Sequence, residues 1–407
     1  MGFLLLRVFV DNKCLKRYIP HHFRQKPLVR KKNRPLLPVR PSRAEIDLSA
    51  IAFNLTGIRK KIGASTKILA VVKANAYGHG DMAVSRFIEK KYADYFGVAI
   101  VEEGMALRTA GITKPILVFT PPVRNQIEPF FEFGLEPSIS SIDDAEALER
   151  AARRLKKSME VHLKIDTGMN RIGVKLKELE SFLAAIASLR RIVIKGVFTH
   201  FATAEDKDKT FTLQQFERFQ ECLSTLHHHG IEPELVHCAN SAAILDLPQT
   251  YCSMVRPGIS MYGYYPSRES SRSVPLRPAM SVTTNVALIK TIDAGESVSY
   301  GRRFVANKRT KIATLPVGYG DGYSRLLTGK SVILIHGMRF PVVGTICMDM
   351  MMANVGDADV GVGDKAILLG KENGQEITCW DLAERIGTIP YELLCGFSAR
   401  IPRTYVK

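Results

Sequence analysis

The stretch that decides the fold runs from Ile68 to Gly80 and reads ILAVVKANAYGHG. Its first five residues are apolar and partly β-branched, which is typical of a buried parallel strand. The run stops at Lys73, and a loop with two glycines follows. A buried lysine has a lowered pKa because an isolated ammonium is costly to desolvate, and a neutral amine can form a Schiff base. Two interpretations of Lys73 therefore stay open at this point: a surface lysine at a strand end, or a nucleophile in a site.

Apolar runs alternate with helical patterns through the rest of the first two thirds of the chain. Strands are expected at residues 68–73, 95–100, 115–120, 135–140, 161–166, 192–199, 235–238 and 254–256. Amphipathic or polar helical stretches lie between most of them, as at residues 142–157 and 212–228. Eight strands in βα order predict an α/β fold, a (β/α)8 TIM-like barrel, better than an open sheet.

The pattern changes after residue 278. Short β-rich segments separated by Gly, Asn and Asp lie at residues 282–289, 311–315, 331–335, 340–345 and 365–369, and residues 380–386 have the pattern of a short helix. These segments predict a second, mainly antiparallel β domain. We therefore expect a basic N-terminal extension over residues 1–43, a barrel over 44–278 and a C-terminal β domain over 279–407.

The positive charge of the chain is concentrated in the extension. Residues 1–43 carry a net charge of +11 out of the total of +17, which argues against a nucleic-acid-binding body. The extension is open to three interpretations: a disordered segment or an upstream start codon, a tether to an anionic surface, or a targeting segment. No apolar run approaches the roughly 20 residues that span a bilayer. Seven cysteines without CxxC spacing indicate reduced thiols in a cytoplasmic protein, and no metal-ligand spacing is present.

Polar residues follow the carboxyl ends of five of the expected barrel strands, where a barrel enzyme builds its active site. Each of them alone has an ordinary structural explanation, but their joint occurrence favours a common site. They are Lys73 and Tyr77, Lys164 and Arg171, His200, Asn240 and Ser241, and Arg256, Gly258 and Ile259.

The segment 68–80 and these strand-end residues, taken in order, resemble the alanine racemases, which are pyridoxal 5'-phosphate (PLP) enzymes of fold type III. The resemblance covers about residues 44–407. It implies that Lys73 carries PLP and exchanges the Cα proton on the D side. Arg171 is expected to contact the phenolic oxygen of the cofactor and the substrate. Lys164 corresponds to a position that is often carbamylated, as N6-carboxylysine, and that orients this arginine.

The same resemblance implies how the rest of the cofactor is bound. Residues at three strand ends would hold the phosphate: Tyr77, Ser241 and the backbone of Gly258 and Ile259. Asn240 is expected to bind the cofactor as well. Arg256 would face the pyridine nitrogen, with His200 beside it. Because a guanidinium stays charged and accepts no proton, the ring nitrogen would remain unprotonated, which favours reprotonation at Cα over transamination.

Three residues of the β-rich region complete the resemblance. Tyr300, within Val298-Ser-Tyr-Gly301, matches the second catalytic base, which reaches the active site from the other subunit of a homodimer. Tyr319 matches a tyrosine that lines the substrate entrance, and the backbone N–H of Met348 matches a ligand of the substrate carboxylate. Ala399 departs from some family members, which have Tyr there, and this departure suggests that serine is accepted as well.

The expected function is therefore the interconversion of L-alanine and D-alanine, which supplies D-alanine for peptidoglycan. The alternatives are a broad-specificity racemase acting on alanine and serine, and a fold-type III decarboxylase. Decarboxylases usually place a carboxylate at the pyridine nitrogen, so Arg256 argues against them. A PLP-binding homeostasis protein is a lone barrel, and the β domain argues against it. No nucleic acid, membrane or metal partner is expected.

Overall fold

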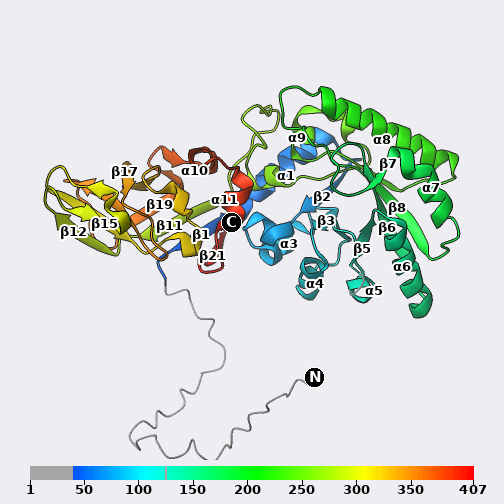
Figure 1. Ribbon diagram of the computed structural model, residues 1–407, viewed down its shortest axis with the longest axis horizontal. Coiled ribbons are helices and arrows are strands. Elements are labelled where there is room, and N and C mark those ends of the chain that lie inside the picture. The colour runs from blue at the N-terminus through cyan, green and yellow to red at the C-terminus, as the bar shows by residue number, and fades with distance from the viewer. Residues whose placement is uncertain (1–39, 124–125) are drawn as a thin grey trace, which may run out of the picture. The chain divides into compact units, whose positions relative to one another are not determined.

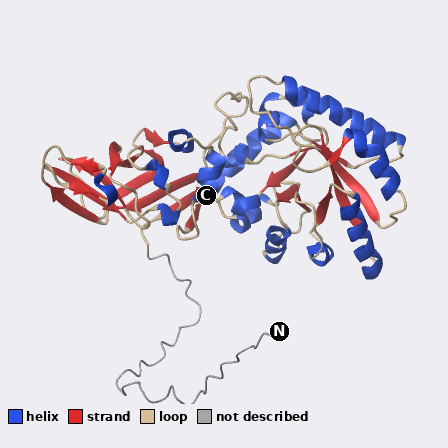
Figure 2. Cartoon of the chain, in the orientation of Figure 1, coloured by secondary structure: helices blue, strands red, loops and turns tan. Residues whose placement is uncertain are grey.

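The computed structural model describes residues 40–123 and 126–407, and two large sheets organise this part of the chain (Figure 1). One sheet is parallel and carries helices on its outer side, and the other is mainly antiparallel (Figure 2). Most of the extension expected over residues 1–43 lies outside the described residues. Arg40 is described, and its Nη2 donates to Asp321 Oδ2 at 2.7 Å.

The parallel sheet forms the barrel in the order β10-β2-β3-β4-β5-β6-β8-β9. Its eight strands are β2 (Lys67–Val71), β3 (Tyr95–Val98), β4 (Ile116–Val118), β5 (Glu136–Ile139), β6 (Met159–Asp166), β8 (Ile192–Phe198), β9 (Leu235–His237) and β10 (Met254–Val255). The last two strands are joined where Ser253 N donates to Val236 O at 3.1 Å and Arg256 N to Ala239 O at 2.9 Å. Each of the eight expected strands is present, which confirms the barrel.

Helices surround these strands, as expected from the amphipathic stretches between them (Figure 1). They are α1 (Leu48–Ile62), α3 (Asp81–Ile88), α4 (Val101–Thr109), α5 (Ile127–Phe133), α6 (Ile142–Leu155), α7 (Leu176–Ile186), α8 (Thr210–His228) and α9 (Ser241–Asp246). Helix α6 shows most clearly how the local sequence specifies such a helix. The Ser141 hydroxyl accepts from Asp144 N at 3.1 Å, and the buried face carries Ala145, Leu148 and Ala152.

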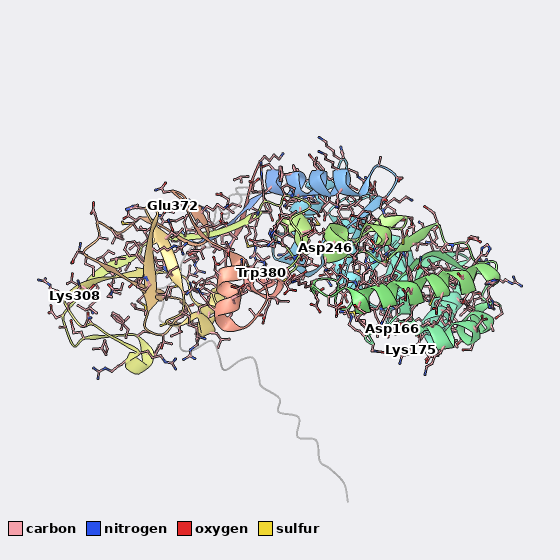
Figure 3. The ribbon with its side chains drawn as sticks, turned by 90° about the horizontal axis from the view of Figure 1, so that it is seen from above. Asp166, Lys175, Asp246, Lys308, Glu372 and Trp380 are labelled. Atoms are coloured by element: carbon pink, nitrogen blue, oxygen red, sulfur yellow. The ribbon has the colours of Figure 1, made fainter. Side chains whose placement is uncertain are left out.

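The second sheet has the order β12-β15-β18-β17-β16-β19-β11-β1-β21, and β20 pairs with β19. Its strands are β1 (Arg43–Asp47), β11 (Met280–Asn285), β12 (Leu288–Ile292), β15 (Thr310–Leu315), β16 (Val332–Ile335), β17 (Met338–Val343), β18 (Met351–Gly356), β19 (Lys365–Glu372), β20 (Gln375–Ile377) and β21 (Arg403–Val406). Helices α10 (Cys379–Ile386) and α11 (Pro390–Gly396) lie between β20 and β21 in the sequence. In Figure 3, Lys308 and Glu372 mark this region, and Lys175 and Asp166 mark the barrel.

Two details of this sheet differ from the expectation. The strand expected at residues 282–289 is two strands, because β11 pairs with β19 while β12 crosses to β15. The first strand of the folded body, β1, belongs to this sheet rather than to the barrel, since it pairs antiparallel with β11 and parallel with β21. The C-terminal strand is therefore held beside the start of the folded body.

Candidate active site

Lys73 does not end a strand, as its position suggested, but opens a short left-handed turn. Strand β2 ends at Val71, and the next element, α2 (Lys73–Tyr77), has φ near +53° at Ala74 and the three residues that follow. L-residues in this conformation cost roughly 1–2 kcal/mol each. The turn is held by Glu103, whose carboxylate accepts from Ala74 N at 2.6 Å, and by Ala76 N, which donates to Val72 O at 2.8 Å. Such strain is typical of functional sites.

The loop after the turn is packed against the C-terminal segment. Gly78 has φ +81°, and a Cβ at this position would lie 2.1 Å from the Leu394 carbonyl oxygen. On the same loop, the Gly78 carbonyl accepts from Arg403 Nε at 2.9 Å. Helix α11 and strand β21 thus hold the lysine loop in place, although they are more than 300 residues away in the sequence.

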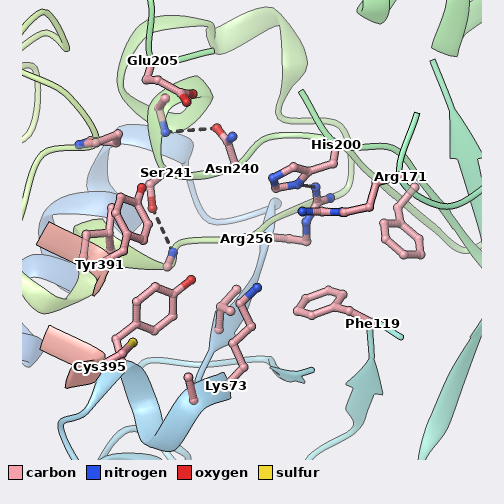
Figure 4. Close-up of a pocket in the computed structure, with 18 of the residues that line it drawn as sticks. Lys73, Phe119, Arg171, His200, Glu205, Asn240, Ser241, Arg256, Tyr391 and Cys395 are labelled. Atoms are coloured by element: carbon pink, nitrogen blue, oxygen red, sulfur yellow. Dashed lines mark hydrogen bonds between the residues drawn. The ribbon is translucent and has the colours of Figure 1, made fainter. Parts of the chain in front are cut away.

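A cavity of about 380 Å³ lies at the carboxyl ends of the barrel strands (Figure 4). Its volume is within the range of small-molecule sites. All ten barrel residues that the sequence placed at the site line it: Lys73, Tyr77, Lys164, Arg171, His200, Asn240, Ser241, Arg256, Gly258 and Ile259. The ten residues that follow the strand ends in the sequence therefore share one cavity.

Several cationic side chains line the cavity, and burial lowers the pKa values of the two lysines among them. Burial lowers the pKa of Lys73, and the charge of Arg171 acts in the same direction. Burial and the charge of Arg256 lower the pKa of Lys164 to about 7, and its Nζ donates to the Ile165 carbonyl at 2.6 Å. Both amines are thereby shifted toward the neutral, nucleophilic form.

Arg256 is buried, and both terminal nitrogens of its guanidinium are engaged by hydrogen bonds. Its Nη1 donates to His237 Nδ1 at 2.9 Å, and its Nη2 contacts His200 Nδ1 at 3.1 Å. The carbonyls of Thr199, His237 and Cys238 accept three further bonds at 2.7–3.1 Å. Burial lowers the pKa of Arg256 to about 10, which leaves it a cation at neutral pH. Burial and this cation hold the pKa of His200 well below its usual range, so the imidazole is neutral.

A polar cradle is present at the opposite side of the cavity. Ser241 Oγ accepts from Gly258 N at 2.9 Å and from Ser260 N at 3.3 Å. The N–H of Ile259 begins the 3-10 turn Ile259–Tyr262, where backbone N–H groups have no partner within the turn. A Cβ at Gly258 would lie 2.7 Å from Tyr77 Oη, so only glycine lets the backbone approach this hydroxyl so closely. These donors fit a phosphate, and with the amine of Lys73 they fit PLP.

The cavity also has lining residues that the sequence did not predict. Glu205 lies near Asn240, and burial raises the pKa of its carboxyl. Tyr391 and Cys395 come from α11, and the ring of Tyr391 is 5.9 Å from that of Tyr77. Nothing in the local pattern of residues 390–396 signals a place in the cavity, because it depends on the packing of α11 against α2.

The three site residues of the β-rich region lie elsewhere. Tyr300, Tyr319 and Met348 line a second cavity of about 860 Å³, which contains none of the barrel residues. Their exposed fractions are high, at 73%, 40% and 52%. Ala399 is exposed and lines neither cavity. One chain therefore does not bring Tyr300 and Lys73 into the same cavity.

Neither a metal site nor a membrane span is found within residues 40–123 and 126–407. No three His, Cys, Asp or Glu side chains in these ranges are placed to bind a metal ion. No helix there is long and apolar enough to cross a membrane.

Comparisons with known proteins agree with this geometry. Residues 46–266 match the alanine racemase N-terminal domain and residues 279–405 its C-terminal domain. The alanine racemase of Clostridium perfringens is 45% identical over 372 residues, covering 91% of this chain and 96% of that protein. That of Halothermothrix orenii is 41% identical, covering 90% and 97%.

Solved structures are similar as well. The alanine racemase of Bacillus anthracis with bound L-Ala-P superimposes with a TM-score of 0.87 at 36% identity, covering 92% of this chain and 96% of that one. The cycloserine complex of the Clostridium difficile enzyme gives 0.84 at 36% identity, with coverages of 90% and 96%. Both domains and almost the whole length of these relatives are matched, so the chain belongs to the alanine racemase family of PLP-dependent isomerases.

Proposed function

We propose that this protein interconverts L-alanine and D-alanine with PLP bound at Lys73, and that Tyr300 of a second subunit supplies the other proton-transfer group. Family membership along nearly the full length supports the reaction. The observation that carries the site assignment is the single cavity in which a partly buried lysine with a lowered pKa lies with Arg171, Arg256 and the Ser241 cradle. The product D-alanine would serve peptidoglycan synthesis.

The cofactor, when bound, supplies an electron sink that stabilises the carbon left when Cα loses its proton. The protein's own residues do the rest. Tyr77, Asn240, Ser241, Gly258 and Ile259 bind the phosphate and fix the position of the ring. Arg256 would face the ring nitrogen and would provide no acceptor for a proton there, because its guanidinium donates only.

Two proton-transfer groups on opposite faces of Cα are needed to change its configuration. The Nζ of Lys73 moves the proton on the D side, and its lowered pKa makes the neutral amine accessible near neutral pH. Tyr300 Oη moves it on the L side. Arg171 would bind the phenolic oxygen of the cofactor and the substrate, and a carbamate on Lys164 would orient it. The N–H of Met348 binds the carboxylate, and Tyr319 lines the entrance.

A homodimer with shared active sites follows from the separation of these groups. Tyr300, Tyr319 and Met348 line a cavity of their own and are exposed in one chain. A second copy that covers this surface with its barrel would complete the site and bury these residues. We place the enzyme in the cytoplasm, where the six cysteines found as free thiols in the described residues stay reduced.

Mixing two inactive variants tests the reaction and the shared site together. Lys73→Ala and Tyr300→Phe proteins, each with less than a hundredth of wild-type racemisation, are unfolded, mixed in equal amounts and refolded. If Tyr300 acts across the dimer, mixed dimers have one intact site, and about a quarter of wild-type activity returns. If no activity returned, Lys73 and Tyr300 would have to act within the same chain. A wild-type protein that binds PLP but leaves alanine unchanged would refute alanine as the substrate.

The broad-specificity alternative rests on Ala399, which is exposed in one chain. A comparison of kcat/KM for L-alanine and L-serine in wild type and Ala399→Tyr tests it. If the small residue admits serine, the tyrosine variant prefers alanine more strongly than the wild type does. An unchanged ratio would show that residue 399 has no part in substrate choice.

A further inference from the structure

Four ionisable side chains form a hydrogen-bonded chain that leads from Arg256 through the barrel interior to the opposite end of the barrel. His237 Nε2 lies 3.0 Å from His162 Nδ1, and His162 Nε2 lies 2.9 Å from Glu136 Oε2. The other oxygen of Glu136 accepts from Lys195 Nζ at 2.8 Å. Both histidines are completely buried. Glu136 opens strand β5, so it lies at the amino end of the strands, whereas Lys73 and Arg256 follow the carboxyl ends.

The strands are shaped to hold this chain of side chains. Gly196 faces His162 across the β6–β8 pair, and a Cβ at Gly196 would lie 2.2 Å from His162 Nδ1, so the imidazole occupies the space of a missing side chain. The register shifts between Val161 and His162, which leaves Lys195 as an extra residue in β8. Such a bulge redirects a side chain, and Lys195 here reaches Glu136.

The donors that each side chain carries determine the direction of every hydrogen bond between Arg256 and Lys195. A guanidinium only donates, so His237 Nδ1 accepts and the proton of this histidine is on Nε2. That N–H donates to His162 Nδ1, which leaves the proton of His162 on Nε2, donating to Glu136. The lysine also only donates, so both oxygens of Glu136 accept and the carboxyl is ionised. If any one of these hydrogen bonds were reversed, either a histidine would carry no proton or two N–H donors would face each other.

The pKa directions agree with this assignment. Burial acts to raise the pKa of Glu136, but the hydrogen bonds from His162 and Lys195 outweigh it and lower the pKa. Burial and the charge of Arg256 hold the pKa of His237 well below its usual range, so this histidine is neutral. The ring of Phe198 stacks on His237 at a centroid distance of 4.9 Å and restricts its rotation.

We propose that Glu136 is a positioning residue for the racemase reaction: through His162 and His237 it fixes the acceptor that faces Arg256 and thereby the guanidinium at the cofactor ring. The inference rests on the proposed function, in which Arg256 lies at the pyridine nitrogen. A carboxylate at one end of the barrel thus controls the proton pattern at the other end. Arg256 keeps His237 as an acceptor only while every proton along the chain points toward Glu136.

The variant Glu136→Gln breaks this pattern because an amide has one accepting oxygen for two donors. Lys195 forms the stronger, charge-assisted bond and takes the oxygen, which turns the amide NH2 toward His162. Both histidines must then move their protons, and His237 presents an N–H to Arg256. Lys195→Met removes the competitor, so in the double variant the amide oxygen returns to His162 and the original pattern is restored.

The test is therefore a cycle of wild type, Glu136→Gln, Lys195→Met and the double variant, each prepared as the PLP-loaded protein. We expect Glu136→Gln to lower racemisation about 10-fold and to weaken PLP affinity of the apoprotein by a similar factor, as for other residues that orient a direct ligand. Lys195→Met stays within about 3-fold of wild type, and the double variant recovers most of the loss. Glu160→Gln, which removes the exposed partner of Lys195, is the matched control.

The recovery distinguishes positioning from structural support. If Glu136 only stabilised the fold, the double variant would be at least as impaired as Glu136→Gln, and unfolding temperatures would follow the same order; that outcome would overturn the proposal. So would a Glu136→Gln protein with wild-type racemisation and PLP affinity. A wild type that binds PLP but does not racemise alanine would refute the proposed function instead, and the affinities of the four proteins would still decide the role of Glu136.

Discussion

The two cavities of this chain differ in how much of their surroundings one chain supplies. In the barrel cavity Arg256 is held by hydrogen bonds to residues at the ends of β8 and β9, and burial lowers the pKa values of Arg256 and Lys73. In the β-domain cavity Tyr300 has an exposed fraction of 73%, and Tyr319 and Met348 are also largely accessible. The barrel half of the site is complete within the chain, whereas the tyrosine half has the exposure of a surface that another copy covers.

This difference predicts that the halves respond differently to mutation. A residue of the barrel cavity controls cofactor binding within its own chain. A residue of the β-domain cavity acts on chemistry in the neighbouring chain and leaves cofactor binding unchanged.

The largest effect is expected for Lys73→Ala. The variant loses the covalent attachment point and one proton-transfer group, so racemisation falls by at least about 10³-fold and the visible absorbance of bound PLP disappears. Absorbance spectra and a D-alanine assay measure both. Lys67→Ala is the control, since Lys67 pairs with Glu234 on the surface and is expected to keep both properties. Normal cofactor absorbance in Lys73→Ala would assign the attachment to another amine.

Tyr300→Phe is expected to lower racemisation by about 10²–10⁴-fold, the range of general acid–base catalysis, without weakening PLP binding. Because Lys73 serves the D side, the variant still exchanges the Cα hydrogen of D-alanine with deuterated water and exchanges that of L-alanine far more slowly. Proton NMR of the two enantiomers measures the asymmetry. Equal exchange of both would show that Tyr300 is not the group on the L side. Tyr323→Phe, a buried tyrosine in the same region, controls for loss of a hydroxyl.

Arg256→Glu introduces a proton acceptor at the cofactor ring, where the wild type has only donors. We expect racemisation to fall and the fraction of turnovers that end in transamination to rise about 10-fold. A protonated ring delocalises the negative charge left at Cα more strongly, so reprotonation at Cα is slower. Pyruvate released from alanine, measured with lactate dehydrogenase, reports the side reaction. A variant with no increase in pyruvate per racemisation event would separate the guanidinium from the control of reaction type.

The sequence predicted the barrel more completely than the second sheet, for a physical reason. Each buried parallel strand has a local signature, a short apolar run, so all eight were found, and their ends brought the ten barrel-site residues together. Partners in the antiparallel sheet depend on distant segments. Nothing near residues 286–287 shows that β11 and β12 pair with different strands, and nothing near Arg43 shows that β1 lies beside β21.

Parts of the site were hidden from the sequence for similar reasons. The left-handed turn at Ala74–Tyr77 runs against the preference of both alanines and of Tyr77. Hydrogen bonds from the turn to Glu103 and Val72, and the packing of the C-terminal segment on the next loop, hold it in place. Tyr391 and Cys395 enter the cavity through the packing of α11. The link from Arg256 to Glu136 joins residues of three strands and the loop after a fourth, and no spacing within one segment indicates it.

The smallest effect we expect concerns Lys164 and depends on pH. Its pKa of about 7 makes the amine largely neutral above pH 7, and we expect this amine to add to CO2 with loss of one proton to give a carbamate, whose negative charge Arg171 and Arg256 would stabilise. Removing CO2 at pH 8 should lower racemisation several-fold, and bicarbonate should restore it. At pH 6 the amine is protonated, and bicarbonate should have little effect.

Lys164→Met should respond to bicarbonate at neither pH, which distinguishes the carbamate from a general effect of the anion. The same pKa fixes the sign of a stability effect. Because the folded value lies below the 10.5 of an unperturbed lysine, the unmodified amine destabilises the fold as pH falls from about 10, and the cost is complete below about 7. Lys164→Met apoprotein in CO2-free buffer should therefore unfold at a higher temperature than wild type at pH 6, with a smaller gain at pH 9. Equal gains at the two pH values would show that Lys164 is not the neutral amine that carbamate formation requires.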